Sequence, residues 1–159
     1  MEPTIFQAHP EIIQKVFNAL DVSTFLNCIL VCKSWNLFLE NPKVWLKQLR
    51  EVGLPKEIET AWKALIEKSK DFKIEKRVFA KCLRMKFLKF IHEQKSCDDS
   101  NEFSYRKNVA ILKKCPPLYT AASVGSIEIV KLIYQLGEDY NRKIELEDND
   151  DYFVSREKS

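Results

Sequence analysis

The chain of 159 residues is poor in the residue types that build most catalytic and phosphate-binding sites. It has only three glycines, and these are scattered, so no glycine-rich loop is available to hold a phosphate group. The two histidines, His9 and His92, are far apart in the sequence, and no Gly-x-Ser-x-Gly motif occurs. These absences leave no recognisable catalytic site. We therefore expect a protein without enzymatic activity of its own and without a cofactor.

Long apolar runs are also absent. No stretch approaches the roughly eighteen apolar residues that a membrane helix needs, and the first seven residues lack both the basic and the apolar part of a secretory signal. The five cysteines are an odd number within apolar helical patterns, which is typical of reduced, buried thiols in an intracellular protein. We expect a protein of the cytosol or the nucleus that has no membrane partner.

Basic and acidic residues are nearly equal in number but unevenly distributed along the chain. Lysine and arginine number 26 against 23 acidic residues, and a net charge of +3 is too small to indicate nucleic-acid binding by itself. Basic residues outnumber acidic ones between Lys56 and Lys114, whereas the end of the chain is acidic. The acidic residues there are Glu138, Asp139, Glu145, Glu147, Asp148, Asp150 and Asp151. A hydrophobic content of 45% provides for one ordinary domain or two small ones.

Residues 9 to 45 carry the densest apolar pattern and predict three short helices. Pro10 suits the first turn of a helix, because its missing N–H would have had no partner there. Asp21 or Ser23 can cap a second, almost wholly apolar segment, and Asn41-Pro42 ends the following one. The apolar positions at helical spacing are Ile12, Ile13, Val16, Phe17, Leu20, Phe25, Leu26, Cys28, Ile29, Leu30 and Val31. About forty residues cannot bury this much apolar surface within themselves, so we expect a partner.

This stretch resembles the F-box family. The resemblance rests on Pro10-Glu-Ile-Ile13, on Val31-Cys-Lys-Ser-Trp35 and on the closing Trp45, at the usual separations of the family. One departure is His9, where the family commonly has leucine. The resemblance implies docking onto the Skp-family linker of a cullin-RING ubiquitin ligase. It implies that the linker-facing or module-forming residues are Pro10, Ile12, Ile13, Phe17, Leu20, Leu26, Val31, Cys32, Trp35 and Trp45. For Trp35 and Trp45, simple core packing is the alternative.

Two amphipathic helices are predicted after Gly53-Leu54-Pro55, over residues 56–69 and 74–94. Residues 96–104 are rich in turn formers and predict a loop. The apolar run at 109–112 fits a helix or a strand by its periodicity, and we favour a helix because its neighbours are helices.

Residues 116–141 resemble one ankyrin repeat, whose signature includes Thr-Pro-Leu-His-x-Ala. Here Pro116 replaces the usual threonine and Tyr119 the usual histidine. We expect Ala121 and Ala122 to allow a close approach of two helices, and Gly125 to form the turn between them. The second helix would bury Ile129, Val130, Leu132 and Ile133 and end at Gly137. Because one such repeat cannot stand alone, either residues 56–112 cover it or further repeats belong to a longer form.

The predicted fold is therefore all-α. It comprises an F-box-like module (1–54), a basic helical region (55–114), an ankyrin-like helix-turn-helix (115–141) and an acidic tail (142–159) that is a candidate for disorder. A zinc site that includes Cys28 and Cys32 is conceivable, but the spacings lack a Cys-x-x-Cys motif, and small core thiols explain the pair better. We expect no metal site.

Three functional hypotheses follow. The first is a non-catalytic substrate receptor of an SCF-type ubiquitin ligase, which binds the linker through its N-terminal module and a client through its C-terminal helices. The second is an interaction scaffold or competitor that uses the module without ligase function. The third is a basic, helical nucleic-acid-associated protein, in which Phe72, Phe79, Phe87 and Phe90 would stack on bases. The helical spacing of these phenylalanines fits a core better.

Overall fold

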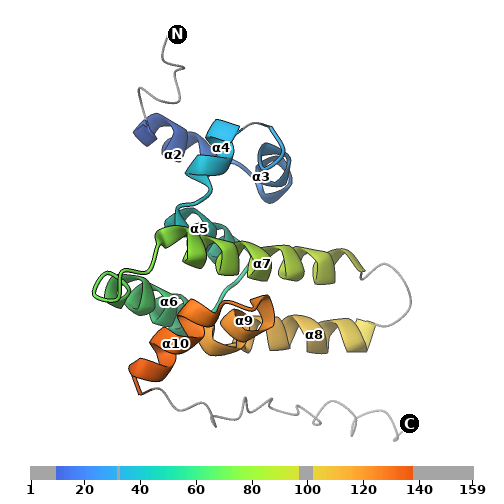
Figure 1. The fold of residues 1–159 in the computed structure, drawn as a ribbon. Helices are drawn as coiled ribbons and strands as arrows, with labels where there is room; N and C mark the ends of the chain where they lie inside the picture. Colours follow the sequence, from blue (N-terminus) through green and yellow to red (C-terminus); the bar gives the residue numbers. More distant parts are fainter. Residues whose placement is uncertain (1–9, 32, 97–101, 138–159) are drawn as a thin grey trace, which may run out of the picture.

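The computed structural model describes residues 10–31, 33–96 and 102–137, and within these ranges it contains helices and no strands (Figure 1). The all-α prediction is confirmed. The first helices are α2 (Pro10–Ala19), α3 (Val22–Cys28), α4 (Lys33–Phe38) and α5 (Pro42–Glu51). They are followed by α6 (Lys56–Lys68), α7 (Lys76–Lys95), α8 (Glu102–Lys114), α9 (Pro117–Val124) and α10 (Ile127–Gln135). The predicted acidic tail, 142–159, lies outside the described residues.

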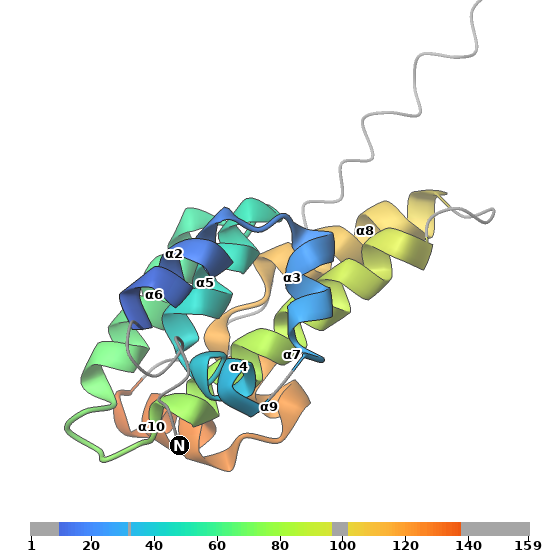
Figure 2. The ribbon, with the colours of Figure 1, turned by 90° about the horizontal axis from the view of Figure 1, so that it is seen from above.

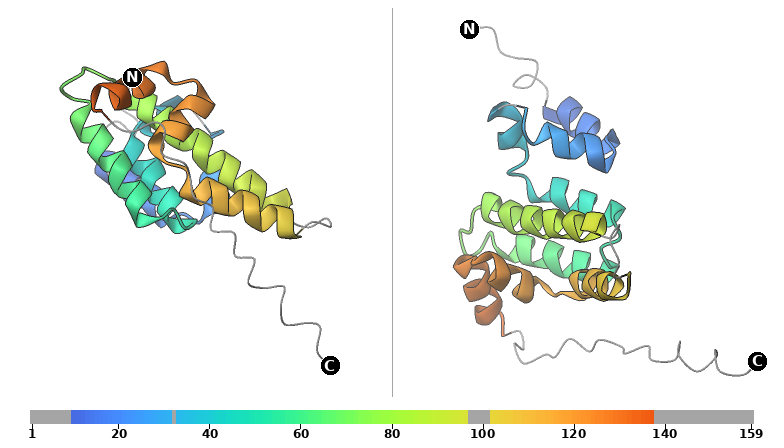
Figure 3. Two further views of the ribbon diagram at one scale, coloured as in Figure 1. Left: turned by 90° about the horizontal axis from the view of Figure 1, so that it is seen from below. Right: turned by 90° about the vertical axis from the view of Figure 1, so that its right-hand side faces the viewer.

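The helices are stacked in three layers. Helices α2, α3 and α4 lie on one side of α5 and α7, and α6, α8, α9 and α10 lie on the other (Figures 1 and 3). Seen from above, the first layer covers only part of α5 and α7 (Figure 2). Helices α2, α3 and α4 therefore form the outermost layer on their side of the protein (Figures 1 and 3).

Two helices of the N-terminal module begin at capping residues, of which Asp21 was predicted as a cap and Asn41 as the end of the preceding segment. Asp21 caps α3, and its carboxylate accepts a hydrogen bond from the backbone N–H of Thr24 at 2.9 Å. Asn41 caps α5 by accepting one from the backbone N–H of Lys43 at 3.1 Å, and Pro42 occupies the first turn.

The predicted second helix is shorter in the structure than its apolar pattern. Helix α3 ends at Cys28, because the backbone N–H groups of Ile29, Leu30 and Val31 bond three residues back, to Leu26, Asn27 and Cys28. This tighter winding ends the α-helix, and α4 begins anew at Lys33. The apolar segment is thus folded into two helices and a turn.

One hydrophobic core runs from α2 to α10. Its centre is a group of aromatic rings, in which Phe25 lies edge-on to Trp45 at a centroid distance of 5.3 Å and to Phe87 at 5.9 Å. The Trp45 and Phe87 rings are 5.8 Å apart. The buried indole N–H of Trp45 donates to the Leu39 carbonyl at 2.6 Å. The module and α7 therefore share one core, and the predicted domain boundaries at 54 and 114 stay predictions.

Helices α6, α7 and α8 confirm the predicted helical region, with one correction. The first two begin and end within two residues of the expected bounds. The predicted loop 96–104 is wrong at its end, because α8 already begins at Glu102, and residues 97–101 lie outside the described part. Val109 and Leu112 of α8 pack against the core, and this packing outweighs the turn propensity of a serine such as the exposed Ser104. The preference for a helix at 109–112 was correct.

Helices α9 and α10 form the predicted helix-turn-helix. Gly125 forms the turn with φ of 73°, and Gly137 follows α10 with φ of 71°, both in the left-handed region that favours glycine. Ala121 is buried as expected, but Ala122 is exposed and does not serve the helix contact. The buried side of α10 consists of Ile129, Leu132 and Ile133, with Val130 partly buried. Helices α6 and α7 contact α9, so the helices before the hairpin supply its packing surface.

Candidate protein-docking site

The N-terminal module leaves a large amount of apolar side chain uncovered. Leu30 is 84% exposed, Val31 59% and Ile12 53%, although the surrounding pattern predicts helices that are covered nearly all round. We call the exposed set the N-terminal apolar surface. It consists of Ile12 and Val16 on α2, Leu30 and Val31 after α3, and Leu37 on α4. Ile12 and Val16 share one side of α2, and Leu30 and Val31 are adjacent in the chain; exposed apolar side chains that gather in this way are typical of protein-contact sites.

The residues predicted from the F-box resemblance fall into three groups. Ile12 and Val31 are exposed and available to a partner. Pro10 begins α2 but its side chain is not described, and Cys32 lies outside the described residues. The remaining residues are buried or partly buried in the module's own core: Ile13, Phe17, Leu20, Leu26, Trp35 and Trp45.

The buried group holds the exposed group in place. The Phe17 ring on α2 contacts the Trp35 ring on α4 at a centroid distance of 5.1 Å and the Phe25 ring on α3 at 5.8 Å. Edge-to-face contacts of this type add to the free energy gained by burial. Phe17 therefore ties three helices together, and this fixes where Ile12 and Val31 lie. Trp45 is fully buried, which fits the alternative of simple core packing, whereas Trp35 is only partly buried.

Sequence reasoning missed three members of the N-terminal apolar surface as site residues: Val16, Leu30 and Leu37. Val16 had a usable signal, because it follows Ile12 by four residues and so lies on the same side of a helix. Leu30 and Leu37 had none, because their exposure depends on how the second apolar segment is divided into α3, a turn and α4.

A charged cluster connects the module to α6. The Arg50 guanidinium donates from Nε to Glu59 Oε2 at 2.9 Å and from a second nitrogen to Oε1, and Lys63 Nζ lies 2.7 Å from the same carboxylate. The hydrogen bonds from Arg50 lower the pKa of the buried Glu59 from 4.5 to about 2, with a further contribution from Lys63. Glu59 is therefore ionised at neutral pH and holds the end of α5 against α6.

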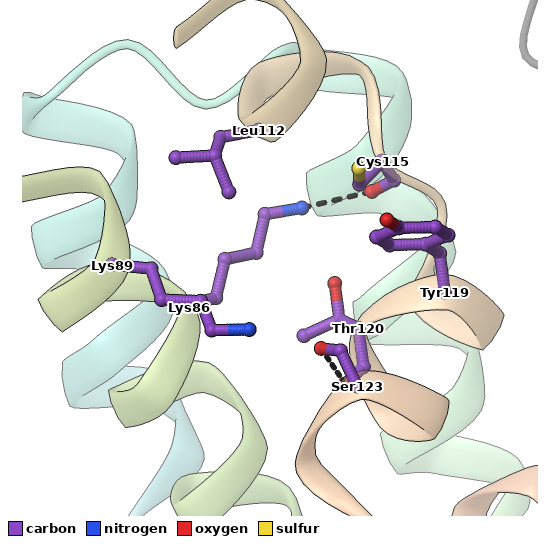
Figure 4. Close-up of a pocket in the computed structure, with 7 residues that line it drawn as sticks. All are labelled: Lys86, Lys89, Leu112, Cys115, Tyr119, Thr120 and Ser123. Carbon is purple, nitrogen blue, oxygen red and sulfur yellow. Dashed lines mark hydrogen bonds between the residues drawn. The ribbon is translucent and has the colours of Figure 1, made fainter. Parts of the chain in front are cut away.

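A second candidate site surrounds Lys86, a buried lysine on α7. Its ammonium group donates to the Cys115 carbonyl at 2.8 Å, and Thr120 and Ser123 of α9 lie opposite (Figure 4). Burial lowers the pKa of Lys86 from 10.5 to about 8. The cavity beside it measures only about 30 Å³, enough for about one water molecule and too small for a substrate. This site therefore has a structural role between α7, α8 and α9.

The described residues offer no metal centre. Burial raises the pKa values of the thiols of Cys28, Cys82 and Cys115, as expected for small side chains packed in a core. Within residues 10–31, 33–96 and 102–137, no group of three or more potential ligands lies close enough to hold an ion. In the same ranges, no helix combines the length and the apolar character needed to cross a bilayer.

The comparison with known families matches residues 10–51 to the F-box-like family. No curated protein matches the chain, and no solved structure does. The matched range covers α2 to α5 and ends before the helix-turn-helix of α9 and α10, so the ankyrin resemblance stays a prediction. F-box domains typically bind partners of the Skp type. The residues that form the N-terminal apolar surface and the core beneath it are thus part of an F-box-like domain.

Proposed function

We propose that this chain is a non-catalytic adaptor that docks onto the Skp-family linker of an SCF-type ubiquitin ligase and holds a client protein with its C-terminal helices. The observation that supports this best is the coincidence of the F-box-like match with the N-terminal apolar surface. A partner that covers this surface would bury Leu30 and Val31 and complete the module. Interfaces of ordinary size bury about 800 Å² on each partner, and most of their affinity comes from a few such anchors.

Ligase action requires no chemistry in this chain. An adaptor raises the local concentration of a client lysine near a charged ubiquitin carrier, which is an effective-concentration effect. The core that runs from the module to α10 supports such a role, because it holds the docking layer and the C-terminal helices in one arrangement. The cytosol and the nucleus stay the proposed locations, and imaging of a tagged chain would test them.

The test is co-purification of the full chain with the linker, beside the variant Ile12→Glu/Val31→Glu. Both residues are exposed, so the variant should fold, whereas truncation of Trp35 would damage the module's own core. We expect the variant to bind at least a hundredfold more weakly, because two charges would be buried without partners. The control is Phe103→Glu, an apolar residue on α8 that is even more exposed, at 77%, and this variant should bind normally. No binding by the folded wild-type chain would refute the proposal.

The scaffold alternative uses the same surface, so binding alone does not separate it from a ligase receptor. The two differ in whether the complex transfers ubiquitin. A reconstituted ligase that ubiquitylates a protein captured by this chain would favour the receptor, and a chain that only displaces other receptors from the linker would favour the competitor.

A further inference from the structure

A groove of about 690 Å³ lies between α7 and the layer formed by α2, α3 and α4, which we call the N-terminal layer. We call it the α4–α7 groove. Its apolar part is formed by Ile29 and Leu39, which follow α3 and α4, and by Val78 on α7. Its rim carries three cations of α7: Arg77, Lys81 and Arg84. It touches the N-terminal apolar surface only at Leu30, so most of it lies outside the proposed linker site.

The three rim cations form one row along α7. Their spacing of four and then three residues places them on the same side of the helix, where like charges repel each other. Arg77 pairs with Glu75, and the Arg84 guanidinium lies 5.9 Å from the centre of the Trp45 ring. In the described part of the chain, no carboxylate forms an ion pair with Lys81 or Arg84. An acidic occupant would relieve this repulsion.

The dimensions of the row match an extended peptide. At a rise of about 1.5 Å per residue, the positions of Arg77 and Lys81 are about 6 Å apart along the axis of α7. In an extended chain, alternate side chains point the same way and are about 7 Å apart. Acidic residues at alternate positions can therefore meet neighbouring cations of the row. An apolar residue of the same peptide could contact the partly buried Val78 and the exposed edges of Ile29 and Leu39, which are 6% and 4% exposed.

Nucleic acid fits the groove less well than such a peptide. Of the four aromatic rings considered for stacking on bases, Phe79, Phe87 and Phe90 are buried in the core. The fourth, Phe72, is exposed but does not line the groove. Glu40 also lines the groove and would repel phosphates and carboxylates alike, so the carboxylates of a bound peptide are expected on the α7 side, beside the three cations.

We propose that the α4–α7 groove binds an extended acidic segment of a client protein, with its carboxylates on Arg77, Lys81 and Arg84 and an apolar side chain beside Ile29 and Leu39. This names the class of client for the adaptor proposed above, and its biological meaning rests on that proposal. The binding itself is independent of the linker.

The experiment measures binding of a fluorescein-labelled ten-residue peptide to the full chain by fluorescence anisotropy. The peptide has four glutamates at alternate positions and one phenylalanine. We expect the variant Arg77→Glu/Lys81→Glu to bind it at least tenfold more weakly. The matched control is Lys107→Glu/Lys114→Glu, which makes the same change in net charge at exposed positions of α8 and should bind within about twofold of wild type. A peptide with glutamine in place of glutamate should also bind at least tenfold more weakly.

Four results would overturn the proposal. The first is equal weakening by the control variant, which would mean a general charge effect, and the second is tight competition by a single-stranded oligonucleotide. The third is competition between the peptide and the linker, which would assign the groove to the linker interface. The fourth is peptide binding that occurs only when the acidic residues of 142–159 are neutralised in the full chain, which would make the chain's own tail the occupant.

The two proposals can fail separately. The variant Arg77→Glu/Lys81→Glu should still co-purify with the linker, and Ile12→Glu/Val31→Glu should still bind the peptide. Loss of both activities in either variant would contradict the separation of the two sites.

Discussion

Helices α2 to α4 and helix α7 are both rich in apolar residues, but they differ in how much of this apolar surface the protein covers itself. On α7, Met85 is the one large apolar side chain that is exposed, whereas Phe79, Leu83 and Phe87 are fully buried. The N-terminal layer leaves five such residues exposed, including Leu30 and Val31. Similar apolar patterns thus serve an internal core in one region and, as we propose, a partner's surface in the other.

The largest effect should come from the core that the two regions share. Replacing Trp45 by alanine would remove the ring that contacts both Phe25 and Phe87, and would leave a large cavity. We expect a loss of about 3–5 kcal/mol in the free energy of unfolding, enough to unfold much of the protein. Urea denaturation followed by circular dichroism measures it. A loss below about 1 kcal/mol would show that the module does not depend on α7.

The next effect concerns the charged cluster that holds α5 against α6. Glu59→Gln should destabilise the protein at pH 7 by up to about 3 kcal/mol, because the wild-type carboxylate has a pKa of about 2 instead of 4.5. This stabilisation is fully present above pH 4.5 and is lost as the pH falls towards 2, so the two proteins should become similar in acid. Urea denaturation at pH 7 and pH 3 tests this.

A matched control for that prediction is Glu67→Gln. Glu67 is exposed and pairs with Lys70 three residues on, at 2.6 Å. Exposed pairs of this kind contribute less than about 0.5 kcal/mol, so this variant should be nearly neutral at both pH values. Equal losses in the free energy of unfolding for Glu59→Gln and Glu67→Gln would show that burial does not strengthen the ion pairs of Glu59.

Lys86 should give a pH dependence of the same direction in the alkaline range. Burial lowers its pKa from 10.5 to about 8, so the unfolded chain binds this proton more tightly than the folded protein does. The lysine therefore makes stability increase between about pH 8 and 10.5, by up to about 3 kcal/mol. The raised pKa values of Cys28, Cys82 and Cys115 act against this increase at high pH, since the folded protein then holds the thiol protons more tightly.

The difference between wild type and Lys86→Met isolates the lysine contribution. Relative to the variant, wild type should gain stability from pH 8 to pH 10, as measured by thermal or urea denaturation. Lys89→Met, on the same helix and exposed, should retain the wild-type pH dependence. Parallel curves for wild type and Lys86→Met would mean that this ammonium is hydrated in solution.

The smallest effect on stability should come from Leu30→Ser, in the most exposed of the apolar residues. The side chain contacts little within the protein, so the free energy of unfolding should change by less than about 0.5 kcal/mol. Linker binding should nevertheless weaken at least tenfold. If Leu30→Ser lost stability but kept linker binding, Leu30 would serve the internal core and not a partner's surface.

The sequence predicted the elements better than their exposure. The helices of the middle region, the cap at Asp21 and the turn at Gly125 have local causes, and all of them were predicted. Whether Leu30 lies inside or outside depends on where α3 ends, which is settled by the winding of Ile29 to Val31 and by packing against residues far along the chain.

Burial of charged side chains was also beyond the sequence. Lys86 has the same helical surroundings as the exposed Lys81, and only the arrival of α8 and α9 over it makes the difference. Periodicity describes one helix at a time, so it carries no information about which neighbour covers a particular residue.

The ring of Phe87 has a consequence for any attempt to transplant the docking module. A fragment that ended near residue 54 would keep the N-terminal apolar surface but would lose the ring that Phe25 and Trp45 pack against. Such a fragment would expose its inner face as well as its outer one and would be prone to aggregate. The proposed recognition of a linker therefore depends on the buried side of α7, and loss of the Phe87 ring should weaken docking at a distance.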